Sequence, residues 1–532
     1  MPSERSDTDK AAADLERIVA ARRRGPLATL GTYVRLSGPG WLQSAITLGG
    51  GSLAASLYLG VLAGSSMLWL QPLAMALGIV MLSAIGYVAL TTGEPPFRAI
   101  CRHVSPVLGW GWALATLAAN MVWCLPQYAL GTSVVQQNLA PGRFGAGSAL
   151  GDTGGKVVIC AVFLALTIAV TFSYGAGGRG VRVFERVLKA LVALIVLSFF
   201  GVIVKLALVE GLDWGSIAAG FVPDLGSFHR PAATFAPHLA GLGAAAHDYW
   251  TAQIVGMQRD VMIAAAATAV GINMTFLMPY SLLARGWGKE FRGLARFDLA
   301  TGMLVPFLLA TSCIVVVAAS RFHAQPVPGL AEPAAEAPAP KLVADYENLL
   351  AGRMELEATA PDASELPLAE RRLAAMLVKR DAFDLAKALE PLAGDFFASI
   401  VFGLGVLAMA LSTITMLMLI SGFVICEMLG RPPTGRTFRL GTLAATTGVL
   451  GPFFWGQAAP YLAIPTSVFG MILLPIAYWT FFLMLNSAAL MGAERPRGRS
   501  RIAWNALMLP AALVATAASL WSVWATVRRL LG

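Results

Sequence analysis

Apolar runs long enough to cross a bilayer recur along this chain, and they constrain its fold more than any other feature. About eleven runs each approach or exceed the ~20 residues that a helix needs to span the hydrocarbon. They lie near residues 38–62, 65–90, 107–139, 155–173, 186–209, 260–284, 299–320, 396–428, 440–460, 462–490 and 503–527. Only 13% of the residues are charged, against about 25% in soluble domains. We expect an all-α, polytopic membrane helix bundle of about eleven spans.

Basic loops support this count and predict the orientation. If the chain crosses the membrane at every run, every second connection should be basic, because cytoplasmic loops are rich in Lys and Arg. The connections on the side of the amino terminus contain Arg98 and Arg102; Arg179, Arg182 and Arg186; Arg285, Lys289, Arg292 and Arg296; Arg431, Arg436 and Arg439; and Arg495, Arg497, Arg499 and Arg501. We therefore assign the net charge of +9 to the surface of a lipid bilayer, with no nucleic acid as a partner.

Composition divides the chain into four segments. They are a cytoplasmic tail (1–36), spans one to seven (37–320), an extracytoplasmic linker and helical insertion (321–395), and spans eight to eleven (396–532). The stretch ATFAPHLAGLGAAAHDYW, residues 233–250, is expected to form a surface helix, since a crossing there would invert the charge pattern. We place the protein in a bacterial inner (plasma) membrane with its amino terminus in the cytoplasm.

Two spans contain residues that break helices. The first has Gly49, Gly50, Gly51 and Ser52 at its middle, and the sixth has Gly271, Asn273 and Pro279. Successive glycines ease unwinding, and the freed backbone groups must face protein, water or a ligand inside the hydrocarbon. Such interrupted spans form the binding sites of secondary transporters. The other interpretation is a small-residue face that lets a neighbouring helix pack closely.

Several short motifs resemble the Nramp family of divalent-metal transporters. They are GPGWL at 38–42, Met278-Pro279-Tyr280, Arg296-Phe297-Asp298, Ser412 to Thr415, Glu427-Met428, Leu474-Pro475 and Met491-Gly492. This resemblance implies a LeuT-type fold, with a 5+5 inverted repeat and broken first and sixth helices. It also implies secondary transport by alternating access, and it makes Met278 the candidate metal ligand.

The chain departs from the family at the first break. The family has Asp-Pro-Gly-Asn where this chain has Gly49 to Ser52, so the acidic metal ligand is absent. We therefore predict a transporter with a non-standard site that carries a metal cation, with a coupling ion as a further candidate partner. The expected substrate-binding residues, in addition to Met278, are Thr47, Gly49, Gly50, Gly51, Ser52, Asn273, Thr275 and Tyr280.

Other functions stay open from the sequence. Backbone N–H groups of the glycine break suit a small organic acid or an amino acid, whereas its carbonyl groups suit a partly hydrated cation such as Mg²⁺. A membrane sensor or scaffold without transport is a further alternative. An enzyme is not expected, because no cluster of His, Glu and Asp lies within one span, and no cofactor is implied. His229, His238 and His247 are nine residues apart, which does not place them on one helical face.

Overall fold

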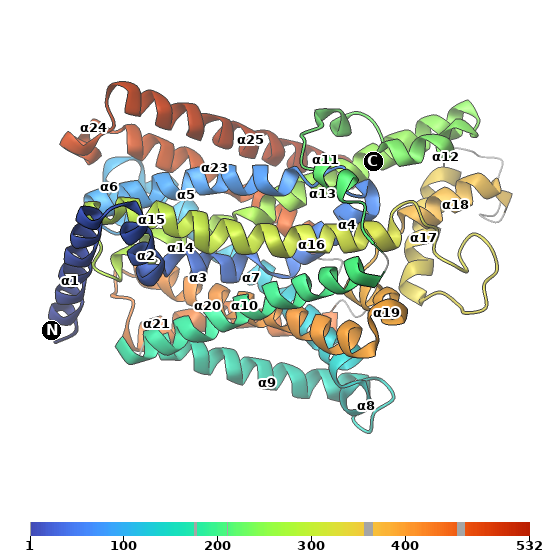
Figure 1. The fold of residues 1–532 in the computed structure, drawn as a ribbon, viewed down its shortest axis with the longest axis horizontal. Coiled ribbons are helices and arrows are strands. Elements are labelled where there is room, and N and C mark those ends of the chain that lie inside the picture. Colours follow the sequence, from blue (N-terminus) through green and yellow to red (C-terminus); the bar gives the residue numbers. More distant parts are fainter. Residues whose placement is uncertain (1, 175–177, 210, 356–364, 455–462, 532) are drawn as a thin grey trace.

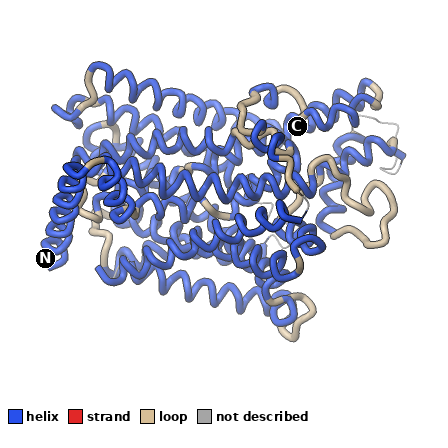
Figure 2. The backbone as a smooth tube through the Cα atoms, viewed as in Figure 1, coloured by secondary structure: helices blue, strands red, loops and turns tan. Residues whose placement is uncertain are grey.

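The computed structural model describes residues 2–174, 178–209, 211–355, 365–454 and 463–531, and this part of the chain contains helices and no strands (Figure 2). Nine of its helices are long and apolar enough to cross a membrane, or ten if a bent pair counts as one span. The bent pair is α3 (Pro39–Thr47) and α4 (Gly50–Ala63). The all-α membrane bundle predicted from the sequence is therefore confirmed.

The remaining long helices follow the predicted apolar runs (Figure 1). They are α5 (Leu70–Thr92), α7 (Pro106–Val134), α9 (Gly151–Tyr174), α10 (Gly178–Val209), α13 (Ala244–Ala269) with α14 (Ile272–Leu283), α15 (Arg292–Leu299) with α16 (Val305–Phe322), α20 (Phe402–Met428), α23 (Ala463–Asn486) and α25 (Gly498–Leu531). Helices outside the candidate spans include α1 (Pro2–Arg24), α2 (Pro26–Leu36), α6 (Pro96–His103), α8 (Pro141–Phe144), α11 (Trp214–Ala219), α12 (Ala236–Ala240), α21 (Gly435–Thr442), α22 (Gly451–Phe454) and α24 (Ala488–Met491).

The outer helices expose large apolar side chains. Leu166, Leu197, Leu208 and Leu513 are examples on α9, α10 and α25, and between 47% and 79% of each side chain is exposed. A soluble protein rarely exposes so many aliphatic side chains, whereas lipid-facing helices do. The exposed surface thus agrees with a bundle surrounded by lipid.

The run predicted as the ninth span is the one that differs most from expectation. It forms α21, a 3₁₀ segment (Leu443–Leu450) and α22, and none of these pieces is a candidate span by itself. Gly448 and Gly451 explain part of the irregularity, because each lies against α7. A Cβ on Gly448 would lie 2.6 Å from Cβ of Cys124, and one on Gly451 would lie 2.2 Å from the carbonyl oxygen of Leu125. Residues 455–462 lie outside the described part.

The sixth span begins earlier than predicted. Residues 244–259, which precede the predicted run at 260–284, belong to α13, and only 236–240 form a separate short α-helix within the expected surface helix 233–250. The 26 residues of α13 extend about 39 Å at 1.5 Å per residue, more than the ~30 Å of a hydrocarbon core. Its first turns therefore project beyond the apolar layer.

The insertion packs on one end of the bundle, where α17 (Pro340–Met354), α18 (Leu368–Leu377) and α19 (Ala382–Ala393) lie together (Figure 1). The hydroxyl of Tyr58 on α4 donates to the carbonyl of Leu377 at 3.3 Å. The indole N–H of Trp250 on α13 donates to Glu370 at 2.9 Å, and Glu370 also pairs with Arg353 at 2.8 Å. The insertion is therefore attached to α4, the second half of the first span, and to α13, the first half of the sixth span.

At the opposite end, the carboxylate of Asp298 on α15 holds the start of α3. It accepts hydrogen bonds from the backbone N–H groups of Gly38 at 3.1 Å and Gly40 at 2.6 Å, and from the hydroxyl of Ser37. A carboxylate at a helix amino terminus satisfies N–H groups that lack partners within the helix, and it interacts favourably with the helix dipole. Asp298 thus positions α3, the amino-terminal half of the first span.

Candidate substrate site at two broken helices

The first span breaks where the sequence predicted. Between α3 and α4, Leu48 and Gly49 leave helical geometry and the helix axis bends by 56°. The glycines are needed for close approach as well as for the turn. A Cβ on Gly49 would lie 2.5 Å from Oγ1 of Thr413, and one on Gly51 would lie 2.9 Å from Oγ of Ser467. Larger residues here would displace α20 and α23.

The sixth span is interrupted at Val270 and Gly271, which adopt extended conformations with φ values of −143° and −92°. Asn273 and Pro279, which we expected to contribute to the break, lie inside α14 instead. Gly271 also has a packing role, because a Cβ there would lie 2.2 Å from the ring of Trp123. The interruption is confirmed, but it is shorter than the sequence pattern indicated.

The two breaks lie against each other inside the bundle. Oγ1 of Thr47, the last residue of α3, is 3.5 Å from the carbonyl oxygen of Ala269, the last residue of α13. The same hydroxyl is 3.4 Å from the sulfur of Met274, and Nε2 of Gln43 donates to the carbonyl of Met274 at 3.3 Å. The carboxyl ends of α3 and α13 therefore meet beside the first turn of α14.

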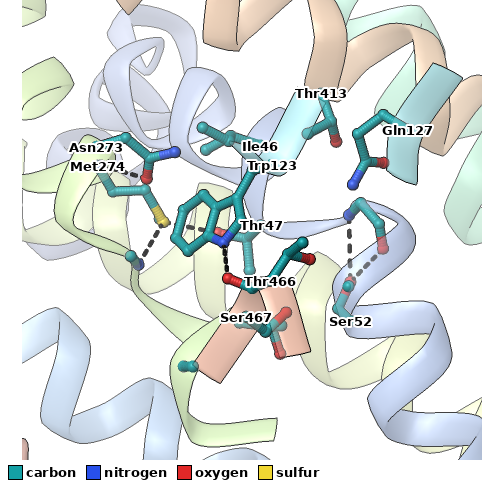
Figure 3. A pocket seen from close by; sticks show the side chains of 15 residues that line it. Ile46, Thr47, Ser52, Trp123, Gln127, Asn273, Met274, Thr413, Thr466 and Ser467 are labelled. Atoms are coloured by element: carbon teal, nitrogen blue, oxygen red, sulfur yellow. Dashed lines mark hydrogen bonds between the residues drawn. The ribbon is translucent and has the colours of Figure 1, made fainter. Parts of the chain in front are cut away.

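A small cavity of 40 Å³ lies between these segments (Figure 3). Its lining residues are Ile46, Thr47, Gly49, Gly51, Ser52, Trp123, Gln127, Ala267, Thr268, Gly271, Asn273, Met274, Thr413, Thr466 and Ser467. None of them carries a charge. A water needs roughly 10–15 Å³ on the same measure, so the cavity has room for about three water-sized groups.

Five of the predicted site residues line this cavity, namely Thr47, Gly49, Gly51, Ser52 and Asn273. Gly50 lies beside them without lining it. Its backbone N–H donates to Oε1 of Gln127 at 2.9 Å, and the N–H of Gly49 donates to the hydroxyl of Ser52 at 3.2 Å. Two of the N–H groups that could have received an anion are thus occupied by acceptors of the protein itself.

Thr275 and Tyr280 lie outside the cavity lining. Oγ1 of Thr275 accepts a hydrogen bond from the indole N–H of Trp112 at 3.0 Å and donates to the carbonyl of Ile272 at 2.5 Å. The ring of Tyr280 stacks on Phe276, with 4.7 Å between the ring centroids. Both side chains pack among neighbouring helices instead of facing the cavity.

Met278 also lies away from the cavity, and Met274 occupies the lining instead. Met278 is fully buried about one helical turn further from the break, beside Gly86 on α5. The sulfur of Met274 faces the break and accepts weak hydrogen bonds from Thr47 and from the N–H of Gly271, each at 3.4 Å. The sequence contains both methionines, but which of them faces the cavity depends on the residue at which α14 begins.

Two polar groups of the cavity lining lack a hydrogen-bond partner among the residues that the structure describes. They are Nδ2 of Asn273 and Oγ1 of Thr413, and both atoms are buried. Oδ1 of Asn273 is occupied, since it accepts from the backbone N–H of Met274 at 2.8 Å. Unpaired buried polar groups are rare in native proteins, and water or an ion often satisfies them.

The chemistry of the site is that of neutral oxygen atoms and one thioether. The last turn of a helix leaves carbonyl groups without partners inside the helix and carries a partial negative charge. Because α3 and α13 both end at the cavity, two such ends converge there. No group of three or more His, Cys, Asp or Glu side chains that could hold a metal ion occurs in the described ranges. The amino ends of α4 and α14 begin at the same cavity, so the helix dipoles there oppose one another, and the site offers uncharged polar atoms without a formal charge.

Fold and site together define a polytopic helical membrane protein of the LeuT type, in which two interrupted spans enclose a small, uncharged cavity. Residues 40–339 and 372–525 match the model of the natural resistance-associated macrophage protein-like family. The chain belongs to this Nramp family, as its motifs indicated.

Individual relatives are distant. Metal transporter Nramp2 of Arabidopsis thaliana is 30% identical over 167 residues, which cover 31% of this chain and only 28% of that relative. Among solved structures, a manganese transporter of Eremococcus coleocola, in complex with an aromatic bis-isothiourea substituted compound, has a TM-score of 0.61 at 14% identity, covering 93% of this chain and 88% of that one. A mutant of the same transporter has a TM-score of 0.60 at 13% identity, covering 93% and 95%. At this identity the structural likeness concerns the fold.

Proposed function

We propose that this chain is a secondary transporter that carries a metal cation by alternating access, and that the cation binds in the cavity between the two broken helices. One observation carries the proposal: the carboxyl ends of α3 and α13 converge on a cavity beside Thr47 and Met274. Interrupted helices with such ends at the cavity are the arrangement in which secondary transporters coordinate cations. The names of the Arabidopsis and Eremococcus relatives, a metal transporter and a manganese transporter, agree with this choice.

The geometry favours a cation over the organic acid that the sequence left open. An anion would need the exposed N–H groups of the glycine break, but those of Gly49 and Gly50 already donate to Ser52 and Gln127. It would also face the carbonyl groups in the last turns of α3 and α13, which lack partners inside their helices. The amide of Asn273 is then available to a water molecule or to another neutral ligand of the cation.

The neutral lining limits how much water the cation gives up. A divalent cation buried without a carboxylate loses hydration energy that neutral groups do not fully replace. With room for about three water-sized groups, the cavity suits a cation that has lost part of its hydration shell and retained the rest. We therefore propose a partly hydrated divalent cation such as Mg²⁺, with the sulfur of Met274 as a minor contact.

Uptake into sealed proteoliposomes tests this function. Mg²⁺ and Mn²⁺ would be offered separately, alongside a panel of small carboxylic acids and amino acids. Met274→Leu should change the ratio of Mn²⁺ to Mg²⁺ uptake, because it removes a soft sulfur from the cavity. Met278→Leu is the matched control, since it makes the same chemical change about one turn away. Uptake of an organic acid and of no metal would overturn the cation proposal, and folded, sealed protein without any uptake would favour the sensor or scaffold.

The topology proposed with this function is that of the four predicted segments. The tail 1–36 and the basic loops would face the cytoplasm of a bacterial cell, and the insertion 321–395 would face outward, as the alternation of charged loops suggests. Single cysteines placed in the tail and in the insertion of a variant without the five native cysteines would be labelled from opposite sides of the membrane. Labelling of both from one side would contradict this arrangement.

A further inference from the structure

The indole of Trp123 occupies a slot that two glycines on different helices leave open. A Cβ on Gly271, at the break of the sixth span, would lie 2.2 Å from the ring, and one on Gly470 of α23 would lie 1.9 Å from it. The indole N–H donates to the carbonyl of Thr466, also on α23, at 2.5 Å. The ring is thus fixed in one position between α7, α14 and α23.

This fixed ring is also part of the cavity wall. Trp123 lines the cavity together with Thr47, Asn273 and Met274, and Figure 3 shows the indole among these side chains with its N–H directed toward Thr466. It is the largest side chain in the lining, and it offers no lone pair to a cation. Its contribution to binding is therefore the space it excludes, together with the attraction of an aromatic face for positive charge.

We infer that Trp123 is a specificity-determining residue that sets how large a hydrated cation the cavity admits. This inference rests on the proposed cation transport. A neutral cavity cannot compensate a divalent cation for the loss of its whole shell, so transport depends on how many waters can remain. Because the indole is held in place by Gly271, Gly470 and Thr466, the cavity cannot widen by a change of its rotamer alone. Larger cations of the same charge are excluded by volume.

Two substitutions should move the selectivity in opposite directions. Trp123→Leu removes most of the ring and enlarges the cavity. Gly470→Ala places a methyl group where the ring now lies. We expect the indole to move toward the cavity, which would become smaller. Gly470→Ala keeps the tryptophan, so a change of selectivity in this variant reports the position of the ring and not the loss of the ring. A purely structural role for Trp123 would lower uptake of all cations equally in both variants.

The experiment is uptake of Mg²⁺, Ca²⁺, Sr²⁺ and Ba²⁺, a series of equal charge and increasing radius, into proteoliposomes. In Trp123→Leu the uptake of the larger cations relative to Mg²⁺ should rise by about tenfold, a typical effect of pocket size on discrimination. In Gly470→Ala the same ratio should fall. Trp110→Leu is the matched control on α7, because Trp110 is exposed and lies outside the cavity lining, and it should keep the wild-type profile.

The outcomes separate this inference from the proposed function. If the wild type carries none of these divalent cations, the proposed function fails. If the wild type carries Mg²⁺ while folded Trp123→Leu and Gly470→Ala keep its size profile, Trp123 does not set the specificity. Thermal unfolding and size-exclusion profiles report folding. Trp123→Phe, which retains a smaller ring, replaces the leucine variant should that variant fail to fold, and it should shift the ratio in the same direction.

Discussion

The backbone N–H of Gly50 donates a hydrogen bond of 2.9 Å to the side-chain oxygen of Gln127, across the interface between α4 and α7. This contact supplies a hydrogen-bond acceptor to a backbone N–H group at the break of the first span. Inside hydrocarbon a helix amino terminus has no water to satisfy its N–H groups, so a side chain from a neighbouring helix has to supply the acceptor. In this chain a neutral amide does so, and the break remains uncharged.

Gln127→Leu should destabilise the protein, because it leaves the buried N–H of Gly50 without an acceptor. An unsatisfied buried group of this kind costs about 1–3 kcal/mol. Thermal unfolding in detergent and hydrogen exchange at Gly50 measure the effect. The variant also frees the N–H for an anion, so it should bind small carboxylic acids better than the wild type does. An unchanged exchange rate at Gly50 would show that the contact does not form.

Gly49→Ala should abolish uptake, because its Cβ would lie 2.5 Å from Oγ1 of Thr413. Thr413→Ala removes that atom, so the double variant should recover part of the lost activity and stability. Coupling between residues in contact is typically about 0.5–3 kcal/mol in a double-mutant cycle. Gly31→Ala on α2 is the control, since nothing lies within 4 Å of its Cβ position. If the stability changes of the two single variants simply add up in the double variant, Gly49 and Thr413 are not in contact.

Glu370→Ala should loosen the insertion from the bundle. Glu370 pairs with Arg353 at 2.8 Å, both side chains are at most 4% exposed, and Trp250 of α13 donates to the same carboxylate. Removing one partner of such a buried pair destabilises by about 3–5 kcal/mol. Limited proteolysis of the insertion would report the loosening.

Glu332→Ala is the matched control for this pair. Glu332 pairs with Arg372 at 2.7 Å, but both side chains are about half exposed. A surface pair contributes about 0–1 kcal/mol, so this variant should resist the protease nearly as well as the wild type. Equal cleavage of the two variants would mean that the buried pair does not hold the insertion.

The packing of α17 against α19 should weaken as the pH rises from about 4 to about 6. Burial, and then the neighbouring charge of Asp381, raise the pKa of Asp384 from 3.8 to about 6, although Lys341 at 3.1 Å opposes the shift. A carboxyl group with a raised pKa in the folded state holds its proton more tightly there than in the unfolded state. Its stabilisation is therefore complete below about pH 4 and is lost as the pH passes through about 6.

Asp384→Asn tests that dependence. The amide keeps an oxygen that can accept the N–H of Asp381, as the carboxylate does at 2.8 Å, but it does not titrate. Hydrogen exchange of residues 340–355 and 382–391, measured between pH 4 and 7 and corrected for the intrinsic exchange rate, should show a smaller pH dependence in the variant. The same pH dependence in both proteins would mean that another group is responsible.

Much of the fold could be predicted because membrane spans are local features. A run of about 20 apolar residues is a helix wherever it lies in the bilayer, and basic loops report its orientation. The predictions were weakest at chain segments whose form depends on a neighbour. The run at 440–460 becomes irregular where Gly448 and Gly451 lie against α7, and α13 continues past the apolar layer because the insertion covers its first turns.

The site shows the same division between local and tertiary information. The residues alone predict that the first and sixth spans are interrupted and that no acidic residue lies at Gly49 to Ser52, because helix breaking and side-chain charge are properties of the residues themselves. Contacts between helices, which the sequence does not reveal, place Met274 and not Met278 at the cavity, Gln127 beside the N–H of Gly50, and Trp123 in the cavity wall. Each of these contacts depends on the residue at which a helix restarts and on the approach of a second helix. A shift of one residue in that start turns every following side chain by about 100° around the helix axis.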